Sequence, residues 1–367
     1  MRTIGTVARG VRAPIIREGD NIAEVAAASV MEAWKEAGIE PHDRDVVAIT
    51  ESVVARAQGN YATLDQIAKD VREKTGGGTV GVAFPIMSRN RFSLLLRGMA
   101  MGCKKIVLLL SYPSDEVGNG LVDWDKLDEA GVDPYSDVLT LEQFREKFGA
   151  AVHPFTGVDY IDFYSGIITD AGAEVEVLFG NRVQTLCGCT DAVITCDIHT
   201  RARSKRLLKA DGAKIVLGLD DLLTKSVDGS GYNEEYGLLG SNKATEESVK
   251  LFPRDCMVVA EELSALLSNA SGKHIEAMVY GDGAFKDPVG KIWELADPVV
   301  SPGYTKGLVG TPNELKLKYL ADNDFGDLKG EALKAAIEER IREKTDESLV
   351  GLSLIHISEP TRRTPIS

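Results

Sequence analysis

The N-terminal region holds a group of polar residues directly after an apolar strand. Residues 46–49 are apolar, Thr50, Glu51 and Ser52 follow them, and Arg56 comes four residues after Ser52. Hydroxyl groups and a guanidinium at the end of a strand can bind a phosphate group, because hydrogen bonds between charged partners are strong. The same residues also suit a strand-to-turn junction with a capping hydroxyl and a solvated arginine. Residue types alone leave both interpretations open.

A second group combines a glycine-rich segment with an aspartate at a strand end. Residues 227–242 contain four glycines, and Asp282 follows a predicted strand over residues 274–280. Glycine lets backbone N–H groups approach a ligand closely, and a carboxylate after a strand can hold Mg²⁺. Asp282, with Gly283 beside it and Asp228 as a companion, is therefore a candidate metal site. The alternative is a glycine-rich loop and an Asp-Gly turn that bind nothing.

A third group lies between a predicted strand over residues 192–196 and a predicted helix. It contains Asp197, His199, Arg201 and Arg203. Ligands of open α/β sheets bind beyond the carboxyl ends of the strands, and arginines at a helix N-terminus attract anions. These residues are candidates for binding a phosphate or a carboxylate. A structural Asp–His pair next to a solvated basic helix face is the alternative.

Strand and helix patterns alternate along the chain and must position these groups. Apolar residues at helical spacing predict helices over residues 21–37, 63–74 and 92–101, and residues 245–271 have a mostly helical pattern. Short apolar runs predict strands at residues 46–49, 79–83, 105–111, 175–179, 192–196 and 213–217. The repeated strand–helix–strand order predicts an α/β domain with a largely parallel sheet over residues 81–223.

Composition limits the function classes. The chain has 367 residues, is 44% hydrophobic and 27% charged, and carries a net charge of -14. The negative charge argues against general binding to nucleic acid or to an anionic membrane, and no apolar run is long enough to span a bilayer. The five cysteines are typical of reduced thiols. We therefore expect a cytoplasmic protein without nucleic-acid or membrane partners.

The C-terminal segment departs from the rest of the chain. Residues 352–367 read LSLIHISEPTRRTPIS, which resembles the conceptual translation of a transposase sequencing adapter. We therefore interpret these residues as an artefact and exclude them from reasoning about the fold. On this interpretation the natural protein continues beyond Gly351.

Several of these motifs resemble one enzyme family when they are taken in order. Residues 14–20 and 53–59 resemble the N-terminal motif pair of the coenzyme F420-0:L-glutamate ligase family. Residues 240–242 resemble the family's Asp-x-Ser-Asn motif, and residues 281–283 resemble its strand-end aspartate motif. The resemblance covers roughly residues 1–60 and 236–300.

The resemblance implies a ligase that depends on GTP and on Mg²⁺ or Mn²⁺. Such an enzyme would activate a carboxylate acceptor as an acyl phosphate and join it to L-glutamate through an amide bond. The expected partners are L-glutamate and a small anionic carboxylate acceptor, and a homodimer is compatible with the sequence. The resemblance places the metal on Asp282. It implies GTP contacts from Ala13, Pro14, Ile15, Ile16, Glu51, Ser52, Arg56 and Asn242.

The sequence also departs from the family pattern. Arg56 stands where the family has lysine, Leu239 where it has a metal-binding aspartate, and Gly283 where it has a hydroxyl residue. Asp228 or Glu235 is a conjectural replacement for the missing carboxylate. The C-terminal glycine-rich nucleotide loop of the family is missing, as expected if residues 352–367 are an artefact.

Residues 76–225 have no recognised counterpart in the family. We therefore predict an α/β fold in which a ligase-like α+β core, residues 1–75 and 226–351, is interrupted by an inserted, largely parallel α/β domain over residues 76–225. In this hypothesis the third group of residues recognises the acceptor. Two alternatives remain: a non-catalytic homologue that binds a nucleotide or metabolite, and a phosphate-handling transferase that uses the inserted domain.

Overall fold

A computed structural model describes residues 7–153, 157–281, 284–286, 293–295, 299, 301–309 and 324–342. The chain divides into two compact units, Met1–Thr305 and Lys306–Ser367. The described part of the second unit contains the short helical turn η3 (Lys306–Leu308) and helix α11 (Gly330–Arg342). No helix among the described residues is both long and apolar enough to span a membrane. The features below belong to the first unit.

A six-stranded sheet occupies the middle of the sequence, with strand order β5-β6-β4-β3-β7-β8. Five strands are parallel, and only the edge strand β5 is antiparallel to its neighbour. Their bounds are β3 (Thr79–Ala83), β4 (Lys105–Leu110), β5 (Leu139–Thr140), β6 (Glu174–Phe179), β7 (Ala192–Thr195) and β8 (Ile215–Gly218). Several strands are apolar along most of their length, as expected for a parallel sheet covered on both faces. The predicted α/β class is confirmed.

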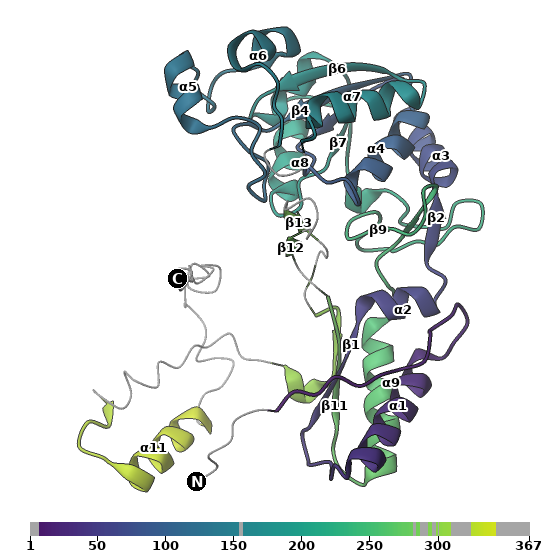
Figure 1. Cartoon of the computed structure of the whole chain (residues 1–367), viewed down its shortest axis with the longest axis vertical. Helices are drawn as coiled ribbons and strands as arrows, with labels where there is room; N and C mark the ends of the chain where they lie inside the picture. Colours follow the sequence, from purple (N-terminus) through teal and green to yellow (C-terminus); the bar gives the residue numbers. More distant parts are fainter. Residues whose placement is uncertain are drawn as a thin grey trace. The chain divides into compact units, whose positions relative to one another are not determined.

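Helices cover both faces of this sheet. One apolar cluster joins Val80 and Leu108 to α3 (Leu64–Thr75), α4 (Phe92–Met101) and α7 (Tyr160–Asp170). A second cluster joins Val107 on the opposite face to η1 (Val183–Gly188) and α8 (Arg201–Ala210). Figure 1 shows these helices around the sheet in the upper part of the view. The remaining elements of this region are α5 (Trp124–Ala130), α6 (Leu141–Phe148) and η2 (Leu219–Asp221).

A smaller sheet has order β1-β11-β14, formed by β1 (Val46–Thr50), β11 (Glu276–Tyr280) and β14 (Gly303–Tyr304). Helices α1 (Ile22–Ala37) and α9 (Cys256–Ser271) pack on it, with Val30, Leu263 and Ala277 in one apolar cluster. Helix α1 begins where Asn21 accepts hydrogen bonds from two backbone N–H groups, and it ends at Gly38 in the left-handed conformation. The predicted helix over residues 21–37 is confirmed within one residue.

A third sheet, of order β2-β10-β9, is antiparallel and contains β2 (Tyr61–Thr63), β10 (Ser248–Lys250) and β9 (Asn242–Lys243). Buried Asn60 precedes β2, and its side chain connects this sheet to neighbouring segments by hydrogen bonds. Its Nδ2 donates to the carbonyl of Phe252 at 2.8 Å, while its Oδ1 accepts from the Tyr232 N–H at 2.9 Å and from Arg254 Nη1 at 2.7 Å. Strands β12 (Ala284–Lys286) and β13 (Trp293–Leu295) form a separate antiparallel pair.

The large apolar core crosses the predicted domain boundary at residues 75 and 76. Ile67 and Val71 before this boundary share one buried cluster with Val80 after it, and Val249 and Leu251 belong to the same cluster. The boundaries of an inserted domain at residues 76–225 therefore stay a prediction.

Candidate functional site

The polar residues after β1 form the start of a helix. Thr50 precedes α2 (Glu51–Ala57), and its side chain accepts a hydrogen bond from the Ser52 N–H at 3.4 Å. The capping interpretation is thus correct for Thr50. The expected turn is wrong, because the chain continues as a helix. Ser52 and Arg56 are four residues apart in α2, which places both side chains on one face.

That face of α2 borders a cavity of about 700 Å³. The opposite wall comes from β2, β9 and β10 and the turn that joins the last two. Strand β10 turns Val249 into the core and leaves Ser248 and Lys250 half-buried, as the alternation of a strand requires. The lining residues are Ser52, Arg56, Tyr61, Asn242, Lys243, Ala244, Thr245, Ser248 and Lys250.

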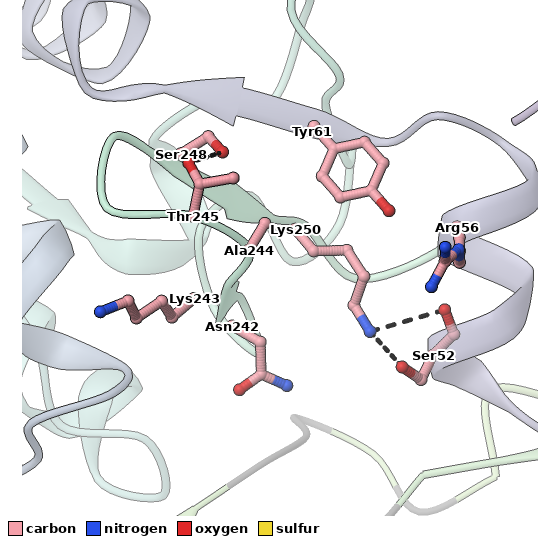
Figure 2. A pocket seen from close by; sticks show the side chains of 9 residues that line it. All are labelled: Ser52, Arg56, Tyr61, Asn242, Lys243, Ala244, Thr245, Ser248 and Lys250. Carbon is pink, nitrogen blue, oxygen red and sulfur yellow. Dashed lines mark hydrogen bonds between the residues drawn. The ribbon is translucent and has the colours of Figure 1, made fainter. Parts of the chain in front are cut away.

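Lys250 connects the two walls. Its Nζ donates a hydrogen bond to Ser52 Oγ and lies 3.5 Å from the Ser52 carbonyl oxygen. Figure 2 shows the Lys250 side chain extending from β10 towards Ser52, with Arg56 on the same helix. Across the cavity, Thr245 Oγ1 and Ser248 Oγ are hydrogen-bonded at 2.7 Å.

The charge of the lining is positive. Arg56, Lys243 and Lys250 contribute cations, and none of the lining residues is a carboxylate. Lys243 forms an ion pair with Glu246, whereas Arg56 forms no ion pair with any described residue. Hydroxyl, amide and cationic groups around one polar cavity are the groups that bind phosphate oxygens. The site therefore suits an anionic ligand.

Three predicted nucleotide-binding residues meet here. Ser52, Arg56 and Asn242 all line the cavity, although Asn242 lies far from the other two in the sequence. The family model described as F420-0:Gamma-glutamyl ligase matches residues 10–353 of this chain. The chain belongs to the F420-0:gamma-glutamyl ligase family. No curated protein and no solved structure matches it.

The N-terminal motif of this ligase-family chain, residues 13–20, packs against α2 and does not line the cavity. Ala13, Pro14 and Ile15 are exposed, and Ile16 is buried in a cluster with Val54 of α2. The Gly19 N–H donates to the carbonyl of Ala57, at the end of α2, at 2.8 Å. The motif therefore packs against the helix that carries Ser52 and Arg56.

Other predicted residues of the ligase site lie elsewhere. Glu51 is buried and does not line the cavity. Asp228 is exposed and forms an ion pair with Lys69 at 2.7 Å. Asp282 and Gly283 lie outside the described residues.

The sheet register nevertheless brings two chain segments to one edge. Strands β1 and β11 are parallel, with Thr50 opposite Tyr280. Gly281 therefore leaves the sheet at the edge where α2 begins. The described residues contain no group of three acidic, histidine or cysteine side chains able to hold a metal.

The third predicted group lies at the start of α8. Asp197 is 2% exposed, and its Oδ2 accepts hydrogen bonds from Thr200 Oγ1 at 2.6 Å and Ser204 Oγ at 2.8 Å. Burial raises the pKa of Asp197, although the two hydroxyl hydrogen bonds oppose this effect. Asp197 thus accepts hydrogen bonds from the residue before α8 and from Ser204 within it.

The three other members of this group have different environments. His199 is exposed, and its backbone N–H donates to Glu116 at 2.7 Å. Arg201 Nε donates to Asp220 Oδ2 at 3.1 Å, and Arg203 is exposed. Arg203 fits the solvated basic helix face that the sequence also allowed, whereas Arg201 is held by a carboxylate.

Sequence reasoning missed most of one wall of the cavity. Residues 245–271 were expected to be mostly helical, but β10 begins at Ser248 and α9 only at Cys256. The polar–apolar–polar order of Ser248, Val249 and Lys250 is the signal for a half-buried strand. The missed lining residues are Tyr61, Lys243, Ala244, Thr245, Ser248 and Lys250.

Proposed function

We propose that this ligase-family chain binds GTP in the cavity between α2 and the β9–β10 hairpin. With GTP and a divalent metal it joins L-glutamate to a small carboxylate acceptor through an acyl phosphate. The observation that carries this proposal is the convergence of Ser52, Arg56, Asn242 and Lys250 on one cavity. Membership of a ligase family supplies the reaction class.

The cations fit the triphosphate of GTP. A unit charge about 4 Å from another contributes roughly 4 kcal/mol at an effective dielectric constant of about 20. Arg56 offers a planar set of donors, while Lys250 offers a compact charge beside Ser52. These groups would bind the phosphate oxygens and stabilise the charge on the departing GDP. Ile16 packs against Val54 and would hold α2 in place. Ala13, Pro14, Ile15 and Glu51 stay proposed GTP contacts, although they do not line the cavity.

The proposed reaction consists of a phosphoryl transfer followed by an acyl transfer. A carboxylate oxygen of the acceptor attacks the γ-phosphorus of GTP, the bond to the bridging oxygen breaks, and GDP leaves. The amino group of L-glutamate then attacks the acyl carbon, phosphate leaves, and a proton is lost from nitrogen.

We assign the metal role to Asp282, with Gly283 beside it and Asp228 as a companion. A bound Mg²⁺ or Mn²⁺ would offset charge on phosphate oxygens. The lining residues of the cavity include hydroxyl and amide oxygens but no carboxylate, so the lining alone does not form a metal site. Asp228 would have to leave its ion pair with Lys69 to take part.

We assign acceptor recognition to the start of α8, where Asp197, His199, Arg201 and Arg203 lie. A mixed group of cations and hydrogen-bonding side chains suits an acceptor that carries both a carboxylate and hydroxyl groups.

One assay tests the proposed reaction. The protein is incubated with GTP, Mg²⁺ or Mn²⁺, L-glutamate and candidate carboxylates, and GDP release is measured. Release that requires both glutamate and an acceptor supports ligation, and Lys250→Ala should abolish most of it. Lys214→Ala is the matched control, because Lys214 is exposed and pairs only with Asp191 among the described residues. Release that needs neither co-substrate contradicts the proposal.

A second function, nucleotide binding without turnover, is favoured by Leu239. This residue stands at the position of the family's metal-binding aspartate, and it is 1% exposed in the large apolar core. GTP binding without GDP release under any acceptor, in the same assay, would support this second function.

A further inference from the structure

Charge is distributed unevenly along the cavity between α2 and the β9–β10 hairpin. The sheet register places Lys250 opposite Tyr61 on one side and opposite Asn242 on the other, so these three side chains share the face that lines the cavity. Lys250 donates a hydrogen bond to Ser52 of α2, and Arg56 lies on the same face of that helix. Two cations therefore lie at the α2 end of the cavity.

The third cation of the lining, Lys243, is neutralised by a carboxylate. Lys243 is paired with the fully buried Val249 across the sheet, so its side chain leaves the face opposite to that of Lys250. Its Nζ forms an ion pair with Glu246 Oε1 at 2.5 Å. In Figure 2 the Lys243 side chain extends away from Lys250 and Ser52. The charge of Lys243 thus does not add to the two cations beside α2.

The turn between β9 and β10 presents uncharged groups at the other end of the cavity. Thr245 and Ser248 line the cavity there with their hydroxyl groups. Ser248 precedes Lys250 by two residues on β10, which separates them by about 7 Å along the strand. The next carboxylate of the turn, Glu247, is paired with Arg97 at 3.0 Å. The cavity therefore has a cationic end and a neutral hydroxyl end.

The two hydroxyl groups of the turn form an ordered pair. Thr245 Oγ1 accepts a hydrogen bond from the Glu247 N–H at 3.2 Å and lies 2.7 Å from Ser248 Oγ. The N–H groups of Ala244 and Thr245 both donate to the Ser248 carbonyl oxygen, at 3.0 and 3.1 Å, and fix the turn. Each hydroxyl has one proton to donate. This arrangement lets Thr245 donate to Ser248, which leaves the Ser248 proton for an acceptor in the cavity.

We propose that GTP lies in this cavity with its triphosphate at the α2 end and its nucleoside at the β9–β10 turn, where the Ser248 hydroxyl donates a hydrogen bond to an acceptor atom of the nucleoside. GTP is divided in the same way as the cavity, into a charged and an uncharged part. Thr245 is a positioning residue that orients the Ser248 proton. This inference rests on the proposed function. It adds the orientation of the nucleotide and a residue that distinguishes GTP from a bare polyphosphate.

The test compares GTP with inorganic tripolyphosphate, which lacks a nucleoside, by calorimetric titration of the full chain with Mg²⁺ present. Ser248→Ala should weaken GTP binding about 2- to 10-fold, because one uncharged hydrogen bond is lost, and should leave tripolyphosphate binding unchanged. Lys250→Ala should weaken the binding of both. The matched control is Ser29→Ala, which removes a half-buried serine of α1 outside the lining of the cavity and should change neither.

Two variants of Thr245 test its positioning role. Thr245→Val removes the hydroxyl and should weaken GTP binding less than Ser248→Ala does, whereas Thr245→Ser keeps the hydroxyl and should bind GTP as the unaltered chain does. Titration with 2′-deoxy-GTP then identifies the acceptor atom. If Ser248→Ala does not weaken 2′-deoxy-GTP binding, the acceptor is the ribose 2′ oxygen, and an equal loss for both nucleotides places it elsewhere on the nucleoside.

Two results would overturn the proposed orientation. Equal losses of GTP and tripolyphosphate binding in Ser248→Ala would place phosphate groups at the turn. Unchanged GTP binding by Ser248→Ala, in a variant that keeps its melting temperature while Lys250→Ala still weakens binding, would remove the nucleoside from the turn. A failure of the proposed function has a different signature: Lys250→Ala would then change the binding of neither ligand, and the inference would fall with it.

Discussion

Lys250 Nζ donates a hydrogen bond to Ser52 Oγ across 198 positions of the sequence. This contact joins β10 to α2 and closes one side of the cavity that we assign to GTP. It also places the Lys250 ammonium beside the helix face that carries Arg56. The relationship explains why a residue outside every recognised motif belongs to the site.

Replacing Lys250 by alanine should weaken GTP binding about 10- to 100-fold, since a hydrogen bond between charged groups contributes roughly 1.5–3 kcal/mol. Titration with a fluorescent GTP analogue measures the change. Lys250→Arg should recover part of the affinity because it keeps the charge. An unchanged dissociation constant for Lys250→Ala would place the nucleotide elsewhere.

Asn60→Ala should destabilise the first unit by about 2–4 kcal/mol. The buried side chain bonds Phe252, Tyr232 and Arg254, and its loss leaves buried polar groups without partners. Urea unfolding measures the free energy. Asn269→Ala, at an exposed position of α9, should change it by less than about 0.5 kcal/mol.

Two glycines of the segment 227–242 should respond differently to alanine. Both Gly229 and Gly237 have positive φ, at 78° and 52°. A Cβ at Gly237 would lie 2.3 Å from the Leu222 carbonyl oxygen, whereas a Cβ at Gly229 would meet nothing within 4 Å. Gly229→Ala should cost about 1–2 kcal/mol from backbone strain alone, and Gly237→Ala should cost clearly more. Equal melting temperatures for the two variants would contradict this packing argument.

The stability of the unaltered chain relative to Asp197→Asn should fall as pH rises above about 4, the usual pKa of aspartate in an unfolded chain. Burial raises the pKa of Asp197, so between the two pKa values the folded state holds a proton that the unfolded state has lost. The free energy of unfolding must then decrease with rising pH. Unfolding of both proteins in urea at several pH values measures the difference. A constant difference across this range would show that Asp197 titrates normally.

Local signals explain which elements the sequence predicted. Helix α1 was predicted because both of its ends have local signals. The Asn21 side chain caps the first backbone N–H groups, and Gly38 adopts the left-handed conformation that ends the helix. The five parallel strands of the large sheet were predicted because parallel strands covered on both faces are short apolar runs, whereas the two-residue edge strand β5 was not predicted. Helix α2 was missed because its seven residues follow a strand directly and include the polar group Glu51 and Ser52.

Most of the candidate site depended on information that is not local. The resemblance pointed to Ser52, Arg56 and Asn242, and all three line the cavity. The contribution of Lys250 depends on the pairing of β10 with β2 and β9, which no nearby residues encode. The partner of Arg201, Asp220, likewise lies beyond the end of another strand.

The distance between the two walls of the cavity along the chain also sets the timing of its assembly during synthesis. At roughly 5–20 residues per second, a ribosome needs on the order of 10–40 s to proceed from Ser52 to Lys250. The whole six-stranded sheet emerges in that interval, because β8 ends at Gly218. Under the proposed function, a nascent chain would gain affinity for GTP only after that sheet has been made. Bound GTP would then stabilise finished molecules and leave partly synthesised ones unaffected.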